Sequence, residues 1–322
     1  MIVEYVGIIG FMPTYLLFKS FKDRGYSFMK PIGLLFVSYA IWLIGTAGLL
    51  PNSQATGILV MLVLSLISLV LFFKNKAEVT NFVKNEWRLI MFSEVLFLVV
   101  LCIWLLYRLY DPSINTTEKP MDFAFLNAVI NTNSFPPNDP WLIGNNITYY
   151  YFGYLIMGTL ALVAGISASI AYNLSLALVA ALSATAIFGL VLNLAWDHKR
   201  HLREAMAVGL FASFVLIGIG NLEGIIEWMT RVMGLGSEGF LSYLDIDGLK
   251  QTATSPTFYP NSLPADHMWW WRATRVIGLI SEGYNLDFTI TEFPFFSALL
   301  GDLHPHYIVI PFFITCVALA FA

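Results

Sequence analysis

The sequence predicts an all-α protein, a polytopic integral membrane bundle of helices with two extracytoplasmic loops. Of its 322 residues, 58% are hydrophobic and 12% are charged, whereas soluble domains carry about 25% charged residues. The mean hydropathy is +0.72, and long stretches of the chain contain no charged residue. This composition excludes a water-soluble domain. It also excludes a disordered chain, because disorder requires low hydrophobicity and high net charge.

Candidate membrane helices lie in the charge-free windows, since crossing a bilayer takes about 20 mainly apolar residues. The longest windows run from Pro31 to Phe73 and from Pro140 to Trp196. The predicted spans are 3–18, 31–50, 56–73, 88–107, 148–166, 169–195 and 205–221, with an eighth beginning at about residue 306. The eighth reaches the last residue after about 16 residues, so we expect the chain to be the N-terminal part of a longer membrane protein.

Basic residues set the expected orientation, because Lys and Arg collect in cytoplasmic loops. The loops 19–30 and 74–88 both have an excess of basic residues, which places both in the cytoplasm and the N-terminus and 108–147 outside. Segment 223–302 carries ten acidic and four basic residues, and we expect it outside as well. That requires 148–195 to make one net crossing, through partial helices whose ends are covered by protein.

These expectations place the protein in the cell membrane and divide the chain into five segments. They are N-terminal transmembrane helices over 1–107, a first extracytoplasmic loop over 108–147, transmembrane helices, some of them partial, over 148–221, a second extracytoplasmic segment over 222–305, and the start of a further transmembrane helix over 306–322. The spans contain few ionisable side chains, so function is expected in the two outer segments. Glu94 is the exception. An intramembrane carboxylate indicates function, but its place one turn inside the span is equally typical of the cytoplasmic interface.

Charge and cysteine content exclude further classes of site. The formal net charge is −4, which offers no electrostatic basis for binding nucleic acid. Cys102 and Cys316 both lie in apolar runs, where a thiol behaves as a small hydrophobic group. Two such cysteines predict neither a disulfide framework nor a zinc site.

The first outer loop contains two candidate catalytic carboxylates. Pro120 suits the first turn of a helix, with Thr117 or Glu118 close to its N-cap. Glu118 and Asp122 are four residues apart, so a helix through both would present them on one face. Such a pair can bind a divalent cation or act as a general base. Simple capping of the helix start explains the same spacing.

Aromatic and basic residues supply candidate substrate-binding groups. Tyr149, Tyr150 and Tyr151 enter a predicted span at its outer end, where they could line a pocket for a sugar or a prenyl phosphate or form an aromatic belt. On a helix Arg272 and Arg275 would be neighbours able to grip a phosphate. The three tryptophans before them are also typical of plain interfacial anchoring.

The end of the second outer segment contains the candidate metal ligands. Imidazole and carboxylate groups together form a metal or an acid–base set, and here they are Glu292, Asp302, His304 and His306. The His-Pro-His spacing matches no closed zinc site. Two histidines and an acid within five residues exceed what interfacial anchoring needs.

With these motifs in view, the chain resembles the YYY membrane protein family over roughly residues 105–310. The resemblance rests on Thr117–Ala128, on Phe135–Tyr154 with its three consecutive tyrosines, and on Glu292–His306. That family in turn resembles the integral-membrane glycosyltransferases that use polyprenyl-phosphate-linked sugars. This second step implies a glycosyltransferase-C-like fold, with Glu118 at the position of their acceptor base or cation ligand. Two departures are that Thr117-Glu118 replaces the usual Asp-Glu pair and that three helices precede the loop instead of one.

The resemblance implies an enzyme that moves a sugar from a polyprenyl-phosphate donor to an acceptor on the extracytoplasmic face. The implied partners are the lipid-linked sugar and membrane lipid, and the implied cofactor is a divalent cation, Mg²⁺ or Mn²⁺. The alternative is a membrane transporter or channel with an acidic outer vestibule, which would place polar groups along a midplane pathway. A non-catalytic membrane scaffold would leave the outer carboxylates and histidines unexplained.

Overall fold

A computed structural model describes residues 1–196, 201–220 and 290–322, with shorter pieces between 223 and 288. The chain forms two compact units. The first comprises Met1–Leu216 and Gly301–Ala322, and the second comprises Ile217–Leu300. Each unit is described by itself, and the candidate site lies within the first.

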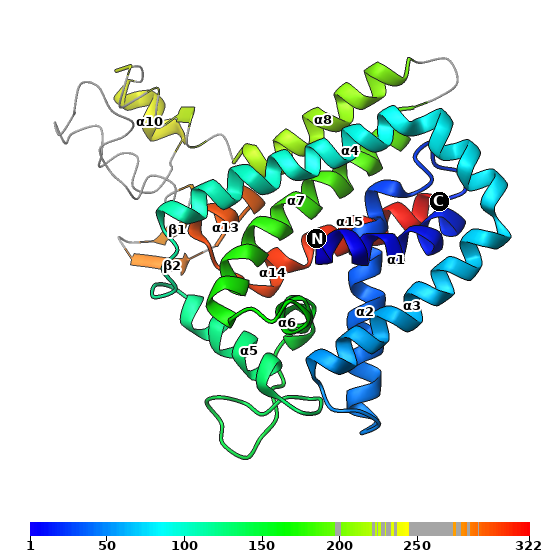
Figure 1. The fold of residues 1–322 in the computed structure, drawn as a ribbon. Helices are drawn as coiled ribbons and strands as arrows, with labels where there is room; N and C mark the ends of the chain where they lie inside the picture. The colour runs from blue at the N-terminus through cyan, green and yellow to red at the C-terminus, as the bar shows by residue number, and fades with distance from the viewer. Residues whose placement is uncertain are drawn as a thin grey trace. The chain divides into compact units, whose positions relative to one another are not determined.

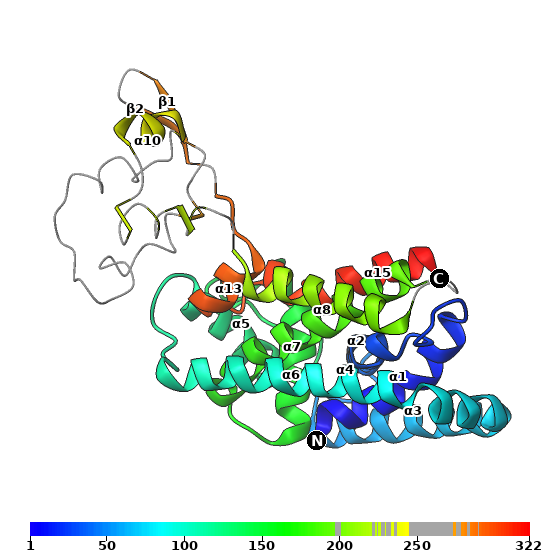
Figure 2. The same ribbon diagram turned by 90° about the horizontal axis from the view of Figure 1, so that it is seen from above.

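The first unit is built of helices, which confirms the predicted all-α class (Figures 1 and 2). Helices α4 and α7 run side by side in it, and α15 packs against α7 and α2. Its helices are α1 (Ile2–Leu17), the 3₁₀ turn η1 (Tyr26–Phe28), α2 (Met29–Thr46), α3 (Gln54–Lys74), α4 (Lys76–Tyr110), α5 (Lys119–Asn131), α6 (Tyr151–Ala164), α7 (Ala168–Ala195), most of α8 (Leu202–Gly218), α14 (Pro305–Ile308) and α15 (Ile310–Phe321).

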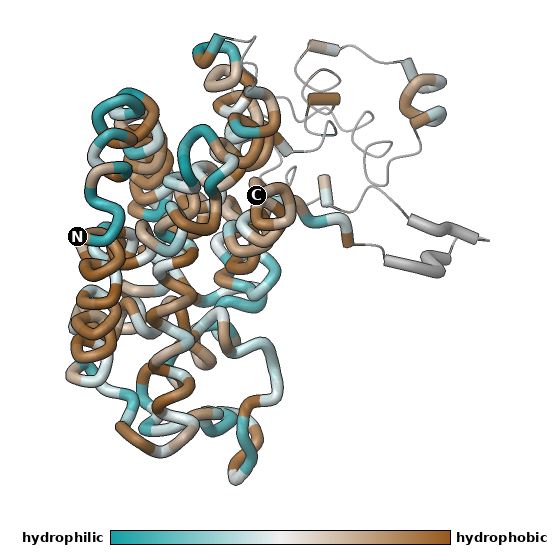
Figure 3. Tube along the Cα trace, turned by 90° about the vertical axis from the view of Figure 1, so that its right-hand side faces the viewer, coloured by the Kyte–Doolittle hydropathy of each residue, from teal (hydrophilic) through white to brown (hydrophobic). Residues whose placement is uncertain are grey.

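Several of these helices suit a membrane, as the composition predicts. Among the described residues, four are long and apolar enough to cross one: 26–46, 54–74, 76–110 and 168–195. Figure 3 shows long apolar stretches along the helices of this unit. Helix α6 has 14 residues, a length of about 21 Å at 1.5 Å per residue, against about 30 Å of hydrocarbon. That length fits the partial helix expected over 148–166, and the number of crossings stays a prediction.

One predicted loop is wrong. Residues 74–88 do not form a loop, because α4 begins at Lys76 and continues without a break to Tyr110. Between these residues the chain has neither proline nor glycine, and Lys, Glu and Arg are good helix formers. The charged residues therefore extend the apolar helix instead of ending it.

Helices α1 and α2 cross with their backbones in contact. A Cβ on Gly10 would collide with the Met29 carbonyl, and a Cβ on Gly33 would collide with the Val6 carbonyl. Close crossing through small residues is a common means of packing membrane helices. At this crossing the backbones of α1 and α2, rather than their side chains, are in van der Waals contact.

An ionic network joins α1, α2 and α4. Nζ of Lys30 lies 2.6 and 2.7 Å from the two carboxylate oxygens of Glu94 and 3.2 Å from Glu4. It also lies 4.4 Å from the centre of the Phe97 ring. The carboxylate of Glu94 is thus paired by a buried lysine, which gives it a structural role.

The second unit contains short elements. Strands β1 (Gly278–Ser281) and β2 (Tyr284–Phe288) pair antiparallel, with Gly278 opposite Phe288. Its helices include α10 (Glu238–Leu244) and α13 (Pro294–Leu300). The amide of Thr291 donates to the Thr274 carbonyl at 2.9 Å.

Candidate functional site

Thr117 and Glu118 precede helix α5, and Thr117 is bonded to a segment that is distant in the sequence. Glu118 is the N-cap residue of α5 and Pro120 lies in its first turn, where the missing N–H removes no helical hydrogen bond. Thr117, before the cap, has a φ of 56°. Its hydroxyl donates to both carboxylate oxygens of Asp302, at 2.8 and 3.1 Å. The start of α5 is therefore joined to the segment that precedes α14.

That segment is held in turn by α4 and α7. Gly301 has a φ of 76°, and a Cβ there would collide with the Arg108 guanidinium. Arg108 is buried, and its Nε and Nη2 donate to Oδ1 of Asn173 at 2.9 and 2.8 Å. The Tyr172 hydroxyl donates to the Gly301 carbonyl at 3.3 Å and accepts from the Leu303 amide at 3.0 Å. Residues 301–303 consequently have little freedom to move.

Three polar side chains meet around the imidazole of His304. Oε2 of Glu118 lies 3.1 Å from Nε2 of His304, and the Tyr149 hydroxyl lies 2.8 Å from the same nitrogen. On the other side of the ring, Nδ1 of His304 lies 2.5 Å from Nδ1 of His306. A carboxylate, a phenol and two imidazoles thus form one chain of polar contacts. Burial and the Glu118 carboxylate raise the pKa of the Tyr149 phenol, so it stays protonated.

Asp122 is buried one turn further along α5. Its Oδ1 accepts a 2.5 Å hydrogen bond from the Tyr154 hydroxyl, whereas Oδ2 has no hydrogen-bond partner. Burial raises the pKa of the Asp122 carboxyl to about 7, and the bond from Tyr154 opposes this rise. A carboxyl with such a pKa holds its proton for a large part of the time at neutral pH.

The two carboxylates therefore have different environments, although their spacing suggests a matched pair. The Glu118 side chain is 61% exposed, and Asp122 is 0% exposed. Because Glu118 caps the helix, it projects from the end of α5, whereas Asp122 packs inside. The exposed member of the pair is the one that also contacts an imidazole.

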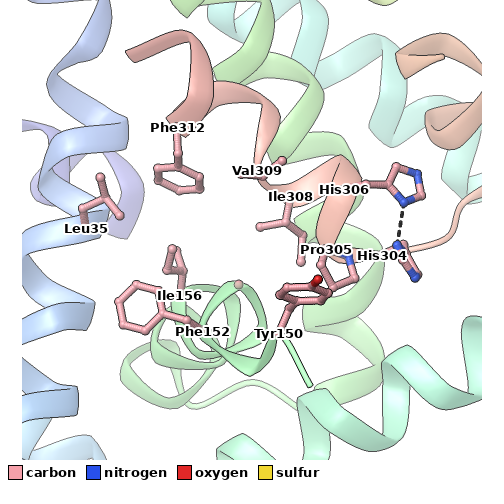
Figure 4. A pocket seen from close by; sticks show the side chains of 11 residues that line it. Leu35, Tyr150, Phe152, Ile156, His304, Pro305, His306, Ile308, Val309 and Phe312 are labelled. Atoms are coloured by element: carbon pink, nitrogen blue, oxygen red, sulfur yellow. Dashed lines mark hydrogen bonds between the residues drawn. The ribbon is translucent and has the colours of Figure 1, made fainter. Parts of the chain in front are cut away.

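An apolar cavity of about 570 Å³ begins beside the two histidines (Figure 4). It is lined by residues of α2, α6, α14 and α15, with His304 and His306 at one side. The lining residues are Leu35, Tyr150, Phe152, Gly153, Ile156, His304, Pro305, His306, Ile308, Val309 and Phe312. The cavity has the character of a site for an apolar chain with a polar group at one end.

Comparison of the sequence with known protein families gives one match. The model of a family described as uncharacterized membrane protein (DUF2298) matches residues 36–322. The chain belongs to the DUF2298 family. No curated protein and no solved structure matches it. Membership makes the chain a membrane protein, and its function has to be inferred from the site.

The three consecutive tyrosines of this DUF2298 chain point to different neighbours. Tyr149 bonds His304, and Tyr150 lines the apolar cavity. The Tyr151 hydroxyl accepts from Nε1 of Trp42 on α2, at 2.8 Å. Two of the three predicted substrate-binding tyrosines therefore lie at the candidate site, and the third joins α6 to α2.

The predicted metal ligands are distributed over both units. Asp302, His304 and His306 lie in the first unit and Glu292 in the second. In the part of the chain that the structure describes, no three His, Cys, Asp or Glu side chains are grouped as metal ligands. The described residues therefore give no donor set for Mg²⁺ or Mn²⁺, and the requirement for a cation stays a prediction. Arg272 and Arg275 lie outside the described residues.

Sequence reasoning missed residues that support the site. Thr117 and Arg108 hold the 301–303 segment, and Lys119 is buried beside them. Burial and the neighbouring Arg108 lower the pKa of the Lys119 ammonium. No local pattern identifies these residues, because a basic residue at the end of an apolar span usually marks the membrane interface.

Proposed function

We propose that this protein is a glycosyltransferase that moves a sugar from a polyprenyl-phosphate donor to an acceptor on the extracytoplasmic face. One observation carries the proposal: an exposed carboxylate lies 3.1 Å from an imidazole that lines an apolar cavity in a membrane protein. A lipid-linked sugar needs both parts, a groove for its chain and a polar site for its anomeric carbon. Family membership supports the membrane setting alone.

The reaction is a displacement at the anomeric carbon. The acceptor hydroxyl gives its proton to a base while its oxygen forms a bond to that carbon. The bond from the anomeric carbon to the phosphate oxygen breaks, and polyprenyl phosphate leaves with the electron pair. Catalysis requires a base near the acceptor and positive groups near the leaving phosphate.

Glu118 is the proposed base, and Asp122 is the proposed positioning residue. Glu118 is exposed and lies 3.1 Å from His304, so a proton that it accepts can be shared with the imidazole. Asp122 is buried, and it holds Tyr154 of α6 against α5. Glu118 and Asp122, which their sequence spacing does not distinguish, thus have different proposed roles.

The apolar cavity is the proposed place of the isoprenoid chain. Its lining carries Tyr150 next to His304 and His306, so a phosphate at the head of the chain would lie close to polar side chains. Arg272 and Arg275 keep the phosphate-binding role that their sequence spacing predicts, and their place lies outside the described residues. The divalent cation likewise stays a prediction, since the described residues include no group of three ligands.

Transport is the competing function. A transporter places ionisable groups along a pathway near the bilayer midplane. In the described spans, Glu94 is paired with Lys30, whereas Glu118 contacts His304, which lines one cavity together with His306. The distribution of charge therefore favours the enzyme.

Release of polyprenyl phosphate tests the proposal. The full-length protein in nanodiscs would be given a panel of polyprenyl-phosphate sugars, with and without Mg²⁺ or Mn²⁺. We expect release by the wild type and a loss of about 100-fold or more in Glu118→Gln, because a general base typically contributes about 10²–10⁴-fold. Tyr149→Phe should reduce release, and Tyr151→Phe is its matched control, because its hydroxyl bonds Trp42. No release under any condition would overturn the proposal.

A further inference from the structure

The loop between α5 and α6 has a closed base. Asn138 and Asn146 form an isolated antiparallel bridge. The amide of Asp139 donates to the Asn145 carbonyl at 2.8 Å, and the amide of Ile147 donates to the Pro137 carbonyl at 2.9 Å. Residues 139–145 therefore form a small, hydrogen-bonded projection.

The tip of this projection is shaped by one carboxylate. Oδ1 of Asp139 accepts from the amides of Trp141 and Leu142 at 2.8 and 3.0 Å. The Leu142 carbonyl accepts from the Asn145 amide at 3.1 Å. Gly144 has a φ of 85°, which only glycine adopts without strain. These bonds satisfy part of the backbone of the turn without help from water.

The side chains at the tip are apolar and largely exposed. Trp141, Leu142 and Ile143 are 58, 60 and 94% exposed. No charged residue occurs from Pro140 to Ile147. Three consecutive exposed apolar side chains on a loop are unusual, because loops that face water are mostly polar.

We propose that the tip Trp141–Ile143 is an interfacial anchor, inserted into the headgroup–acyl boundary of the bilayer that holds the protein. Three observations select lipid over a protein partner. The tip carries no charge, it includes a tryptophan, which favours this boundary, and its amides at Trp141 and Leu142 are satisfied internally. Internal hydrogen bonds lower the cost of moving these amides out of water, since an unpaired backbone group in an apolar setting is costly in free energy.

The anchor is joined to the candidate site through aromatic contacts. The Trp141 ring lies edge-on to Phe125 of α5, with 5.4 Å between ring centres, and Phe125 stacks on Tyr149, also at 5.4 Å. Tyr149 bonds His304. Insertion of the tip would therefore hold Tyr149 in place, and the inference itself does not depend on the reaction proposed above.

Site-directed spin labelling tests the insertion. In a background of Cys102→Ser and Cys316→Ser, a nitroxide would be attached to Ile143→Cys or, as the matched control, to Asn138→Cys at the base of the loop. Both residues are exposed, so neither label disturbs the core. Accessibility to molecular oxygen, which partitions into lipid, would be compared with accessibility to a water-soluble nickel chelate in nanodiscs of phosphatidylcholine and phosphatidylglycerol.

We expect the oxygen-to-nickel accessibility ratio to be several-fold higher at position 143 than at position 138. The same difference should disappear in Asp139→Ala, which removes the acceptor that shapes the tip. Equal ratios at the two positions in the parent background would overturn the proposal. A label at 143 shielded from both reagents would also overturn it, because that pattern indicates contact with protein.

Discussion

The Tyr154 hydroxyl donates a 2.5 Å hydrogen bond to Oδ1 of Asp122, and this buried pair joins α6 to α5. The other carboxylate oxygen has no hydrogen-bond partner. An ionised Asp122 carboxylate loses its hydrating water on burial, and in return it accepts one hydrogen bond, from the Tyr154 hydroxyl. Burial consequently raises the pKa of Asp122 from its ordinary value of 3.8 to about 7.

Stability should therefore fall with rising pH between about 4 and 7. The folded protein keeps the Asp122 proton in this window, whereas the unfolded chain releases it near pH 4. The favourable contribution of the neutral carboxyl is thus fully present below pH 4 and is lost as pH rises through 7. Asp122→Asn keeps an acceptor for Tyr154 and cannot ionise. We expect its Tm to gain on the wild-type Tm as pH rises from 5 to 8, measured by thermal unfolding in detergent.

A constant Tm difference across this range would contradict the prediction, because a purely steric effect of the amide does not depend on pH. Glu118→Gln provides the comparison. The Glu118 side chain is mostly exposed, so its replacement should leave the pH dependence of Tm nearly unchanged.

Gly301→Ala should destabilise the protein, since Gly301 has a φ of 76° and its missing Cβ leaves room for Arg108. The left-handed conformation alone costs an alanine about 1–2 kcal/mol. Gly48→Ala isolates that part, because Gly48 has a φ of 67° and open space where its Cβ would lie. We expect Tm to be highest for the wild type, lower for Gly48→Ala and lowest for Gly301→Ala.

Equal losses in the two variants would show that the Arg108 guanidinium moves aside at little cost. In that case residues 301–303 would be less constrained than their hydrogen bonds suggest. Arg108→Lys would then also be tolerated, although it replaces the planar group that donates twice to Asn173.

The sequence was sufficient for the fold class and for the start of α5. Hydropathy identifies helices that need a bilayer, and Pro120 with Glu118 marks a helix N-terminus that the structure confirms. The prediction of a loop over 74–88 is wrong, because charge alone does not end a helix. Lys, Glu and Arg are good helix formers, and this stretch has no proline or glycine to interrupt α4.

The arrangement of the site could not be predicted, because it depends on contacts between distant residues. Glu118 and His304 meet only when the segment before α14 packs beside α5. The difference between an exposed Glu118 and a buried Asp122 likewise depends on what covers α5, and the spacing of four residues is the same in either case. The sequence suggests the residue types, and packing decides which of them meet.

Asp23 provides a test of how the turn before η1 is attached to α7. It is buried, its Oδ1 accepts from Nδ2 of Asn193 at 2.9 Å, and its Oδ2 accepts from the Ser27 hydroxyl at 2.7 Å. Asp23→Ala leaves the buried Ser27 hydroxyl without this acceptor, at about 1–3 kcal/mol, and takes from Nδ2 of Asn193 one of its two acceptors, the other being the Gly189 carbonyl. We expect a large decrease in Tm, and a smaller one for Asp23→Asn. A Tm close to that of the wild type for Asp23→Ala would show that water replaces the carboxylate.

Lys30 should be more important for stability than either of its acidic partners. It lies 2.6 Å from Glu94 and 3.2 Å from Glu4, and its removal leaves two neighbouring carboxylates without their cation. Breaking a buried ion pair from one side costs about 3–5 kcal/mol, whereas replacing both partners by apolar groups is often neutral.

We therefore expect Lys30→Met to decrease Tm strongly and Lys30→Met with Glu94→Leu to recover most of the loss. Lys22→Met, in the pair Lys22–Glu86, should show a smaller effect, because the Lys22 side chain is 24% exposed against 5% for Lys30 and has one carboxylate partner in place of two. A double variant no more stable than Lys30→Met would mean that the packing of the lysine chain against Phe97, and not its charge, carries the contribution.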